Sequence, residues 1–448
     1  MRYLRKKSGF GAALTCTLAV AGSAPAWSAG TDDPVAVRTS TSTCRDSSAQ
    51  CVLLRIDYAA RAEARPRRPP LNVALVLDTS ASMAEAHKLP YALDAARVLI
   101  ENLTDRDVFS LVAFSNQAIV LAGAGRVVNK AFLLHRLDEI VAENYTNLSA
   151  GLLEGIAQIR TSAVDGQVQR VFVLTDGQAN RGETAPGALR RMVEKAKGRS
   201  ISVSTFGLGT EFNEKLLADL SMAGGGRYTY VGTPEQIPLA FEDELHGMVD
   251  VVAQNATLDL AVQGGRISKV YGRLLDEPTS SYKLVIADVR AAERGFLLAR
   301  LQFDSDAMLQ ADVRLTFDDP LTGTRFSPLV SVHVPQTIGS DDPSVSALAA
   351  ILEAMETAEI AAQGLDVEEY RSARNSFERL YVEARAVAIR NRDQELLNQT
   401  FILKHFMEEL AAAESAGLLH GHQDARARLT KESHYLRYLS THHRPLQP

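Results

Sequence analysis

Hydrophobic runs alternate with amphipathic segments between Leu71 and about Val249. The expected strands are Asn72–Leu77, Asp107–Phe114, Arg170–Thr175, Ile201–Gly207 and Arg227–Val231, with a short edge strand at Ala118–Leu121. Several of them are unbroken Val, Ile, Leu and Phe runs, which are typical of parallel strands buried on both faces. Helical patterns separate them at Tyr91–Leu103, Lys130–Val141, Leu148–Arg160, Pro186–Lys197, Glu214–Met222 and Pro234–Gly247. The alternation predicts an α/β domain over residues 71–250, with a doubly wound and mostly parallel sheet.

The pattern becomes antiparallel in character over residues 251–336. Short alternating stretches, separated by turns, occur at Ala256–Val262, Ile267–Gly272, Tyr282–Ala287, Phe296–Phe303, Ala311–Phe317 and Leu329–Val334. Strands of this length and spacing predict a small β-sandwich. Residues 29–70 are expected to contribute a lead-in, loose in the Thr- and Ser-rich part from Gly30 to Ser48, and at least one strand of the sandwich, Cys51–Tyr58.

Residues 337–448 carry a helical pattern. Its segments are Ser344–Gln363, Val367–Asn391, Gln394–Ser415 and Ala425–Ser440. Leu, Ala and Met recur in them at helical spacing, so we expect a helical region packed as a bundle or against the sandwich.

The first 28 residues have the layout of a secretory signal peptide. Four basic residues within the first seven precede an apolar run from Gly9 to about Ala21, and small residues follow. Cleavage after Ala26 or after Ser28 satisfies the small-residue rule. The apolar run is short for a bilayer span, so we expect membrane contact only if the segment stays uncleaved. The protein is therefore expected to be exported, either to the periplasm or to the cell surface.

Export changes the interpretation of the cysteines. Cys16 lies inside the signal segment, which leaves Cys44 and Cys51 in the mature chain. In an oxidising compartment two cysteines this close are expected to form one structural disulfide.

Composition and charge exclude one class of partner. The 448 residues include 48 Lys and Arg against 54 Asp and Glu, for a formal net charge of −6. This slightly acidic balance argues against a nucleic-acid partner. No sequence feature fixes the oligomeric state.

The candidate chemistry lies where two expected strands end. Asp78-Thr-Ser80-Ala-Ser82 directly follows one strand, and Asp176 follows another about a hundred residues later. In a doubly wound sheet, ligands bind outside the carboxyl ends of the strands. Two carboxylates and two hydroxyls at such an edge are the oxygen ligands that a hard divalent cation requires.

These residues resemble the von Willebrand factor type A domain with a metal-ion-dependent adhesion site, over roughly Pro70 to Val249. In that family a D-x-S-x-S element, a loop threonine and an aspartate after the fourth strand hold one divalent cation. The resemblance implies that Asp78, Ser80, Ser82, Thr146 and Asp176 form the site here. It implies Mg²⁺, with Mn²⁺ or Ca²⁺ as alternatives. The wider layout is similar to exported bacterial proteins of this family and to inter-alpha-trypsin-inhibitor heavy chains.

Only two of the five ligand side chains are acidic, so a bound cation keeps part of its charge. Ser80 and Ser82 are expected to be direct ligands, and Thr146 a direct or water-mediated one. Asp78 and Asp176 would supply charge directly or through water. The natural completing ligand is an Asp or Glu carboxylate of a protein partner.

We therefore expect a non-enzymatic, metal-dependent adhesion module of the cell envelope. The alternative is a structural or accessory subunit of an envelope complex. A metal-dependent hydrolase is less favoured, because the sequence has no G-x-S-x-G or H-E-x-x-H pattern and no evident general base near Ser80.

Overall fold

The computed structural model describes residues 33–45, 50–61, 68–273, 275–286, 288–303, 309–334, 341–364, 367–415 and 423–441. The predicted signal segment, residues 1–28, lies outside the described residues. Within them, no helix has both the length and the apolar composition needed to cross a membrane.

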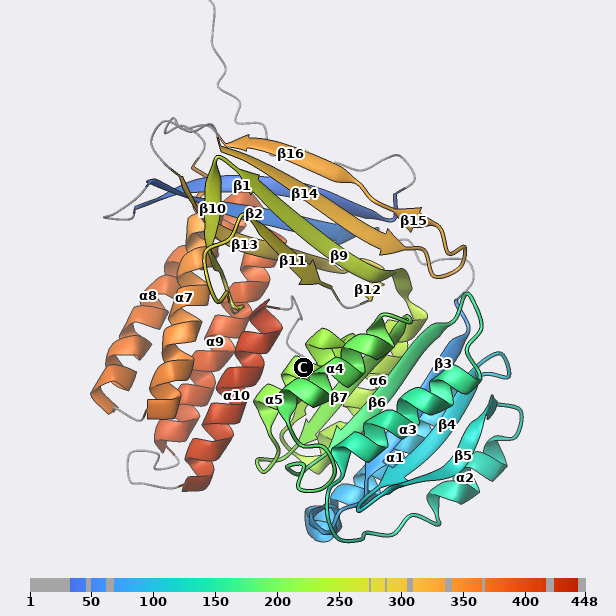
Figure 1. Cartoon of the computed structure of the whole chain (residues 1–448). Helices are drawn as coiled ribbons and strands as arrows, with labels where there is room; N and C mark the ends of the chain where they lie inside the picture. The colour runs from blue at the N-terminus through green and yellow to red at the C-terminus, as the bar shows by residue number, and fades with distance from the viewer. Residues whose placement is uncertain are drawn as a thin grey trace, which may run out of the picture.

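A six-stranded sheet forms the centre of the predicted α/β domain (Figure 1). Its strands, in spatial order, are β5 (Ala118–Arg126), β4 (Val108–Phe114), β3 (Leu71–Asp78), β6 (Val168–Thr175), β7 (Ile201–Leu208) and β8 (Gly225–Val231). Neighbouring strands are parallel except β5, which runs antiparallel to β4 at one edge. The central strands β3 and β4 are buried along their whole length, as their unbroken apolar runs predict.

Helices cover both faces of this sheet. The helices on one face are α1 (Lys88–Asn102), α2 (Lys130–Leu137) and α6 (Ile237–Val249), preceded by the 3₁₀ segments η1 (Ala81–His87) and η2 (Pro234–Gln236). Those on the other face are α3 (Leu148–Thr161), α4 (Pro186–Lys197) and α5 (Glu214–Ala223). Alternate residues of β3 divide between the two cores, since Leu75 packs on the first face and Val76 on the second. The doubly wound prediction is confirmed.

Two antiparallel sheets form the sandwich. One has the order β1 (Val35–Arg45), β2 (Gln50–Ala60), β13 (Arg294–Phe303) and β10 (Gly265–Val270). The other contains β11 (Ser281–Val285), β9 (Val251–Gln263), β14 (Leu309–Asp318) and β15 (Arg325–Phe326), with β12 (Val289–Arg290) on β9 and β16 (Leu329–Val334) on β14. Because β1 and β2 precede the α/β domain in the chain, that domain is inserted between segments of the sandwich.

The expectation of a loose lead-in from Gly30 to Ser48 was wrong, because Val35–Arg45 is a strand. Val35 and Val37 point into the sandwich core, and every residue of β1 has a partner in β2. The polar Thr and Ser residues that suggested a loop occupy strand positions, which β-branched Thr tolerates well. Cys44 and Cys51 face each other in this hairpin and form the predicted disulfide.

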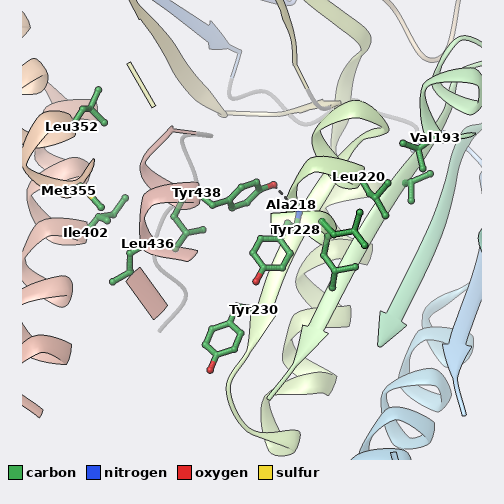
Figure 2. Close-up of a cluster of buried hydrophobic side chains, with 14 of the residues drawn as sticks. Val193, Ala218, Leu220, Tyr228, Tyr230, Leu352, Met355, Ile402, Leu436 and Tyr438 are labelled. Atoms are coloured by element: carbon green, nitrogen blue, oxygen red, sulfur yellow. Dashed lines mark hydrogen bonds between the residues drawn. The ribbon is translucent and has the colours of Figure 1, made fainter. Parts of the chain in front are cut away.

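The C-terminal helices are α7 (Pro343–Gly364), α8 (Val367–Asn391), α9 (Gln394–Ser415) and α10 (Gln423–Thr441). They stand beside the α/β domain and below the sandwich (Figure 1). Helix α10 covers β8, where the Tyr438 hydroxyl accepts a 2.8 Å hydrogen bond from the Tyr228 backbone N–H (Figure 2). Lys431 of α10 also donates to Glu214 and to the Phe212 carbonyl. The helical region thus protects one edge of the sheet.

A buried ion network joins the sandwich to the start of β6. Arg170 contacts Glu244 of α6 and Asp288 of the sandwich, each at 2.5 Å, and all three side chains are at most 3% exposed. Arg290 of the sandwich lies 3.0 Å from the second oxygen of Glu244. Burial opposes ionisation of Glu244, but Arg170, Arg227 and Arg290 together lower its pKa to about 2.

Replacing Glu244 with glutamine should destabilise the protein, because the buried guanidinium groups lose their shared carboxylate. We expect the free energy of unfolding at pH 7 to fall by about 3–5 kcal/mol. The folded pKa of Glu244 is below its ordinary value of 4.5, so its contribution is present above about pH 4.5 and lost as the pH falls towards 2. The gap between wild type and Glu244→Gln should narrow over that window.

Urea unfolding at pH 7 and pH 3 measures both effects, with Glu101→Gln on the exposed surface of α1 as the control. A loss below about 1 kcal/mol at pH 7, or a gap that does not change with pH, would contradict the assignment.

Candidate functional site

The site residues meet at the carboxyl edge of the central sheet. Asp78 is the last residue of β3, and Asp176 directly follows β6. These strands are hydrogen-bonded neighbours, with Leu77 beside Leu174, so their ends bring the two carboxylates together. Both side chains are fully buried, as desolvated carboxylates at a functional edge often are.

Hydrogen bonds connect the two carboxylates through the predicted hydroxyls. The Ser80 backbone N–H donates to Asp78 Oδ1 at 2.8 Å, and Ser80 Oγ lies 3.2 Å from Ser82 Oγ. Ser82 Oγ in turn donates to Asp176 Oδ1 at 2.8 Å. Thr175 Oγ1 donates to Asp78 Oδ2 at 2.5 Å. The D-x-S-x-S element is therefore folded back against the acid of the neighbouring strand.

Thr146 reaches the same edge from the loop before α3. A side-chain carbon placed on Gly177 would lie 3.4 Å from Thr146 Oγ1 and 3.8 Å from Ser82 Oγ, so the two hydroxyls flank that glycine. The loop is held in place because the Thr146 N–H donates to Asn180 Oδ1 at 2.9 Å and the Asn180 N–H donates back to the Thr146 carbonyl at 3.0 Å. All five predicted metal-site residues are thus brought together.

Close packing of α3 on the sheet fixes where this loop stands. A side-chain carbon on Gly155 would lie 2.5 Å from Cγ2 of Val76, so only glycine permits this approach. At the start of the helix, the Asn147 side chain accepts a hydrogen bond from the Ala150 N–H, and the Asn147 N–H donates to the Ser115 carbonyl.

Lys88 is a site residue that the sequence reasoning missed. We expected no general base near Ser80 and gave Lys88 no role in the site, but this first residue of α1 places its ammonium 2.6 Å from Asp176 Oδ2. The backbone turns there through left-handed conformations at Ala86 and His87, with φ of 49° and 58°, which periodicity does not reveal. Lys88 contacts Asp176 and makes no described contact with Ser80. It therefore does not supply the general base that Ser80 would need to act as a nucleophile.

Of the other polar residues near the edge, Asn180 supports Thr146 as described above. Glu85 is exposed in η1, as expected for a loop residue. The Glu183 N–H donates a hydrogen bond to Ser149 Oγ at 3.0 Å. Among the described hydrogen bonds, none joins Glu183 to the five predicted metal-site residues.

Burial raises the pKa of Asp78 to about 6, and the neighbouring Asp176 adds to the rise. Hydrogen bonds from Thr175 and Ser80 oppose it. A carboxylate in such a place is held without a full set of compensating positive charges, which a bound cation would supply.

The donor set fits a hard divalent cation. Five oxygen-bearing side chains converge on one edge, two of them carboxylates and three hydroxyls. No group of three or more His, Cys, Asp or Glu side chains in the described part of the chain could hold a metal. A transition-metal site of that kind is therefore not seen there, and the hydroxyls are essential to the fit.

Comparison with known proteins identifies the domain that contains this edge. The family model for the von Willebrand factor type A domain matches residues 72–243. The chain is 27% identical to the protein YfbK of Escherichia coli over 46% of its own length and 36% of the relative's. It is 28% identical to human inter-alpha-trypsin inhibitor heavy chain H3 over 49% of its length and 27% of that protein. The chain thus spans well under two thirds of these relatives.

The fold also matches a solved structure, the von Willebrand factor type A protein from Catenulispora acidiphila. The TM-score is 0.61 at 15% identity, and the match covers 83% of this chain and 91% of the other. At this identity the likeness concerns the fold, and its coverage extends beyond the matched domain.

Domains of this family are in general protein-interaction modules, and they commonly bind a divalent metal. Residues 72–243 of this chain therefore form a von Willebrand factor type A domain.

Proposed function

We propose that this protein is exported and binds an acidic residue of a partner protein through a divalent cation, Mg²⁺ in the first instance. Ser80, Ser82 and Thr146 would hold the ion, and Asp78 and Asp176 would supply the negative charge. When bound, the ion supplies an open coordination position for a carboxylate. The observation that carries the proposal is the convergence of these five oxygen donors on one strand edge.

The charge balance supports a carboxylate as the completing ligand. Two carboxylates face the site, and Lys88 already offsets part of the charge of Asp176. A divalent cation there keeps net positive charge, which attracts an anionic group from outside. A neutral ligand would leave that charge uncompensated.

The position of the edge supports binding of a large partner. The sandwich meets the domain at Arg170, near the start of β6, whereas Asp176 follows the end of that strand, about 20 Å away at strand rise. Figure 1 shows the pale-blue turn after β3 at the end of the domain opposite the sandwich. Among the described residues, the sandwich and the helical region lie away from this end in Figure 1, which supports approach by a protein partner.

Asp78→Ala should abolish the grip while leaving the fold in place. Removing this carboxylate should weaken Mg²⁺ binding about 100-fold or more in isothermal titration calorimetry. Chelator-reversible capture of a partner from an envelope extract should disappear in parallel.

Asp165→Ala is the matched control, because Asp165 is an exposed aspartate near the start of β6. It should bind Mg²⁺ and capture the partner like wild type. Capture that EDTA does not reverse, or that survives in Asp78→Ala, would contradict the proposal even if Mg²⁺ binds.

Lys88→Met should tighten Mg²⁺ binding, because it keeps the aliphatic side chain and removes a positive charge in contact with Asp176. We expect an increase in affinity of about tenfold, equivalent to about 1.4 kcal/mol. In EDTA the same variant should unfold at a lower temperature than wild type, since Asp176 is fully buried and loses its ion pair. Lys195→Met, which removes an exposed charge from α4, should change neither quantity. Unchanged or weaker Mg²⁺ binding in Lys88→Met would show that the ammonium does not compete with the ion.

A further inference from the structure

Tyr145, the residue immediately before the metal-site threonine, has an unusual backbone. Its φ is 69°, in the left-handed region, while its ring remains 48% exposed. A bulky aromatic residue rarely adopts this conformation, and it persists only where the surroundings impose it. Burial of the ring does not offset the conformational cost of this backbone, so the contacts of the exposed ring have to account for it.

A second loop, residues 180–183, contacts the residues that directly follow Tyr145. Asn180 exchanges two hydrogen bonds with Thr146. Gly182, with φ of 68°, lies very close to Asn147 of the first loop. A side-chain carbon on Gly182 would lie only 2.2 Å from Asn147 Oδ1. The Glu183 N–H donates to Ser149 Oγ at 3.0 Å. The two loops are thus clamped together along residues 146–149.

Arg181 is the member of the second loop that contacts Tyr145. Its guanidinium carbon lies 4.0 Å from the centroid of the Tyr145 ring, within stacking distance. Arg181 itself is exposed, and no carboxylate or hydrogen-bond acceptor contacts its side chain within the described residues. The ring therefore holds the guanidinium in place while its N–H groups remain available to a ligand.

We propose that Arg181, held on Tyr145, is a second carboxylate-binding point beside the cation site, so that the partner presents two acidic residues. One carboxylate would complete the cation, and the other would pair with Arg181. The inference rests on the proposed function, because it assigns the first carboxylate to the metal.

Adjacency of the two points follows from the clamp. Tyr145 is bonded in the chain to Thr146, Arg181 is bonded to Asn180, and Thr146 and Asn180 are hydrogen-bonded to each other. A planar guanidinium fixed by stacking recognises a carboxylate through two parallel hydrogen bonds, and it loses little conformational freedom on binding. Lysine at this position would keep the charge without the fork or the stacking.

The test uses the full chain in MgCl₂ and immobilised poly-L-glutamate as the probe. Arg181→Gln should weaken binding to the polymer about tenfold, with Mg²⁺ affinity and melting temperature unchanged. Arg181→Lys should recover only part of the loss. The directly measured dissociation constant of N-acetylglutamate amide, a single side-chain carboxylate, should be equal for wild type and Arg181→Gln, because that ligand occupies the cation alone.

Arg160→Gln is the control for net charge. Arg160 is an exposed residue near the opposite end of α3, about 18 Å along the helix axis from Leu148 at its start. If Arg181→Gln and Arg160→Gln bind the polymer equally well, the second binding point is refuted while the cation grip stands. The proposed function itself fails if wild type in MgCl₂ does not bind the polymer. It also fails if wild type in EDTA, or the Asp78→Ala variant in MgCl₂, binds the polymer as well as wild type in MgCl₂ does.

Discussion

Parallel pairing of β3 with β6 is the constraint on which the rest of this structure depends. The pairing places Leu77 beside Leu174, and the next residues along each strand bring Asp78 and Asp176 to one edge. Two carboxylates this close and this buried would repel each other without compensation. Hydrogen bonds from Thr175, Ser80 and Ser82, and one ion pair with Lys88, offset part of this repulsion. Positive charge at this edge is therefore stabilising in the absence of any partner, as the contact between Lys88 and Asp176 illustrates.

The sandwich and the helical region contact two other borders of the domain. The sandwich is assembled from segments before and after the domain, and it contacts the end of the domain that lies away from Asp78 and Asp176. Arg170 pairs there with Glu244 of the domain and with Asp288 of the sandwich. Helix α10 covers β8 through the contact between Tyr438 and Tyr228. Buried ion networks and aromatic packing of this kind fix the relative positions of the three parts more strongly than loops alone could.

Two loops around the carboxyl edge of the central sheet share the task of holding it. Hydrogen bonds between Thr146 and Asn180, and the close contact of Gly182 with Asn147, make the loops a single rigid unit. The unit carries both the Thr146 hydroxyl of the predicted metal site and the contact between Arg181 and Tyr145. Preorganised groups of this kind lose less entropy when a ligand binds.

Much of this was determined by the sequence itself. Strand and helix periods encode the doubly wound sheet because each element has to bury one or both faces, and the D-x-S-x-S element needs only its own strand to reach the edge. The close spacing of Cys44 and Cys51 likewise sufficed to predict their pairing. Tertiary structure alone decided the rest. The sequence of β1 resembles a polar loop, and only its pairing with β2 makes it a strand. The roles of Lys88 and Arg181 depend on their contacts with Asp176 and Tyr145, which lie far from them in the sequence. Such contacts depend on left-handed turns and on the packing of separate elements, and neither leaves a periodic trace in the chain.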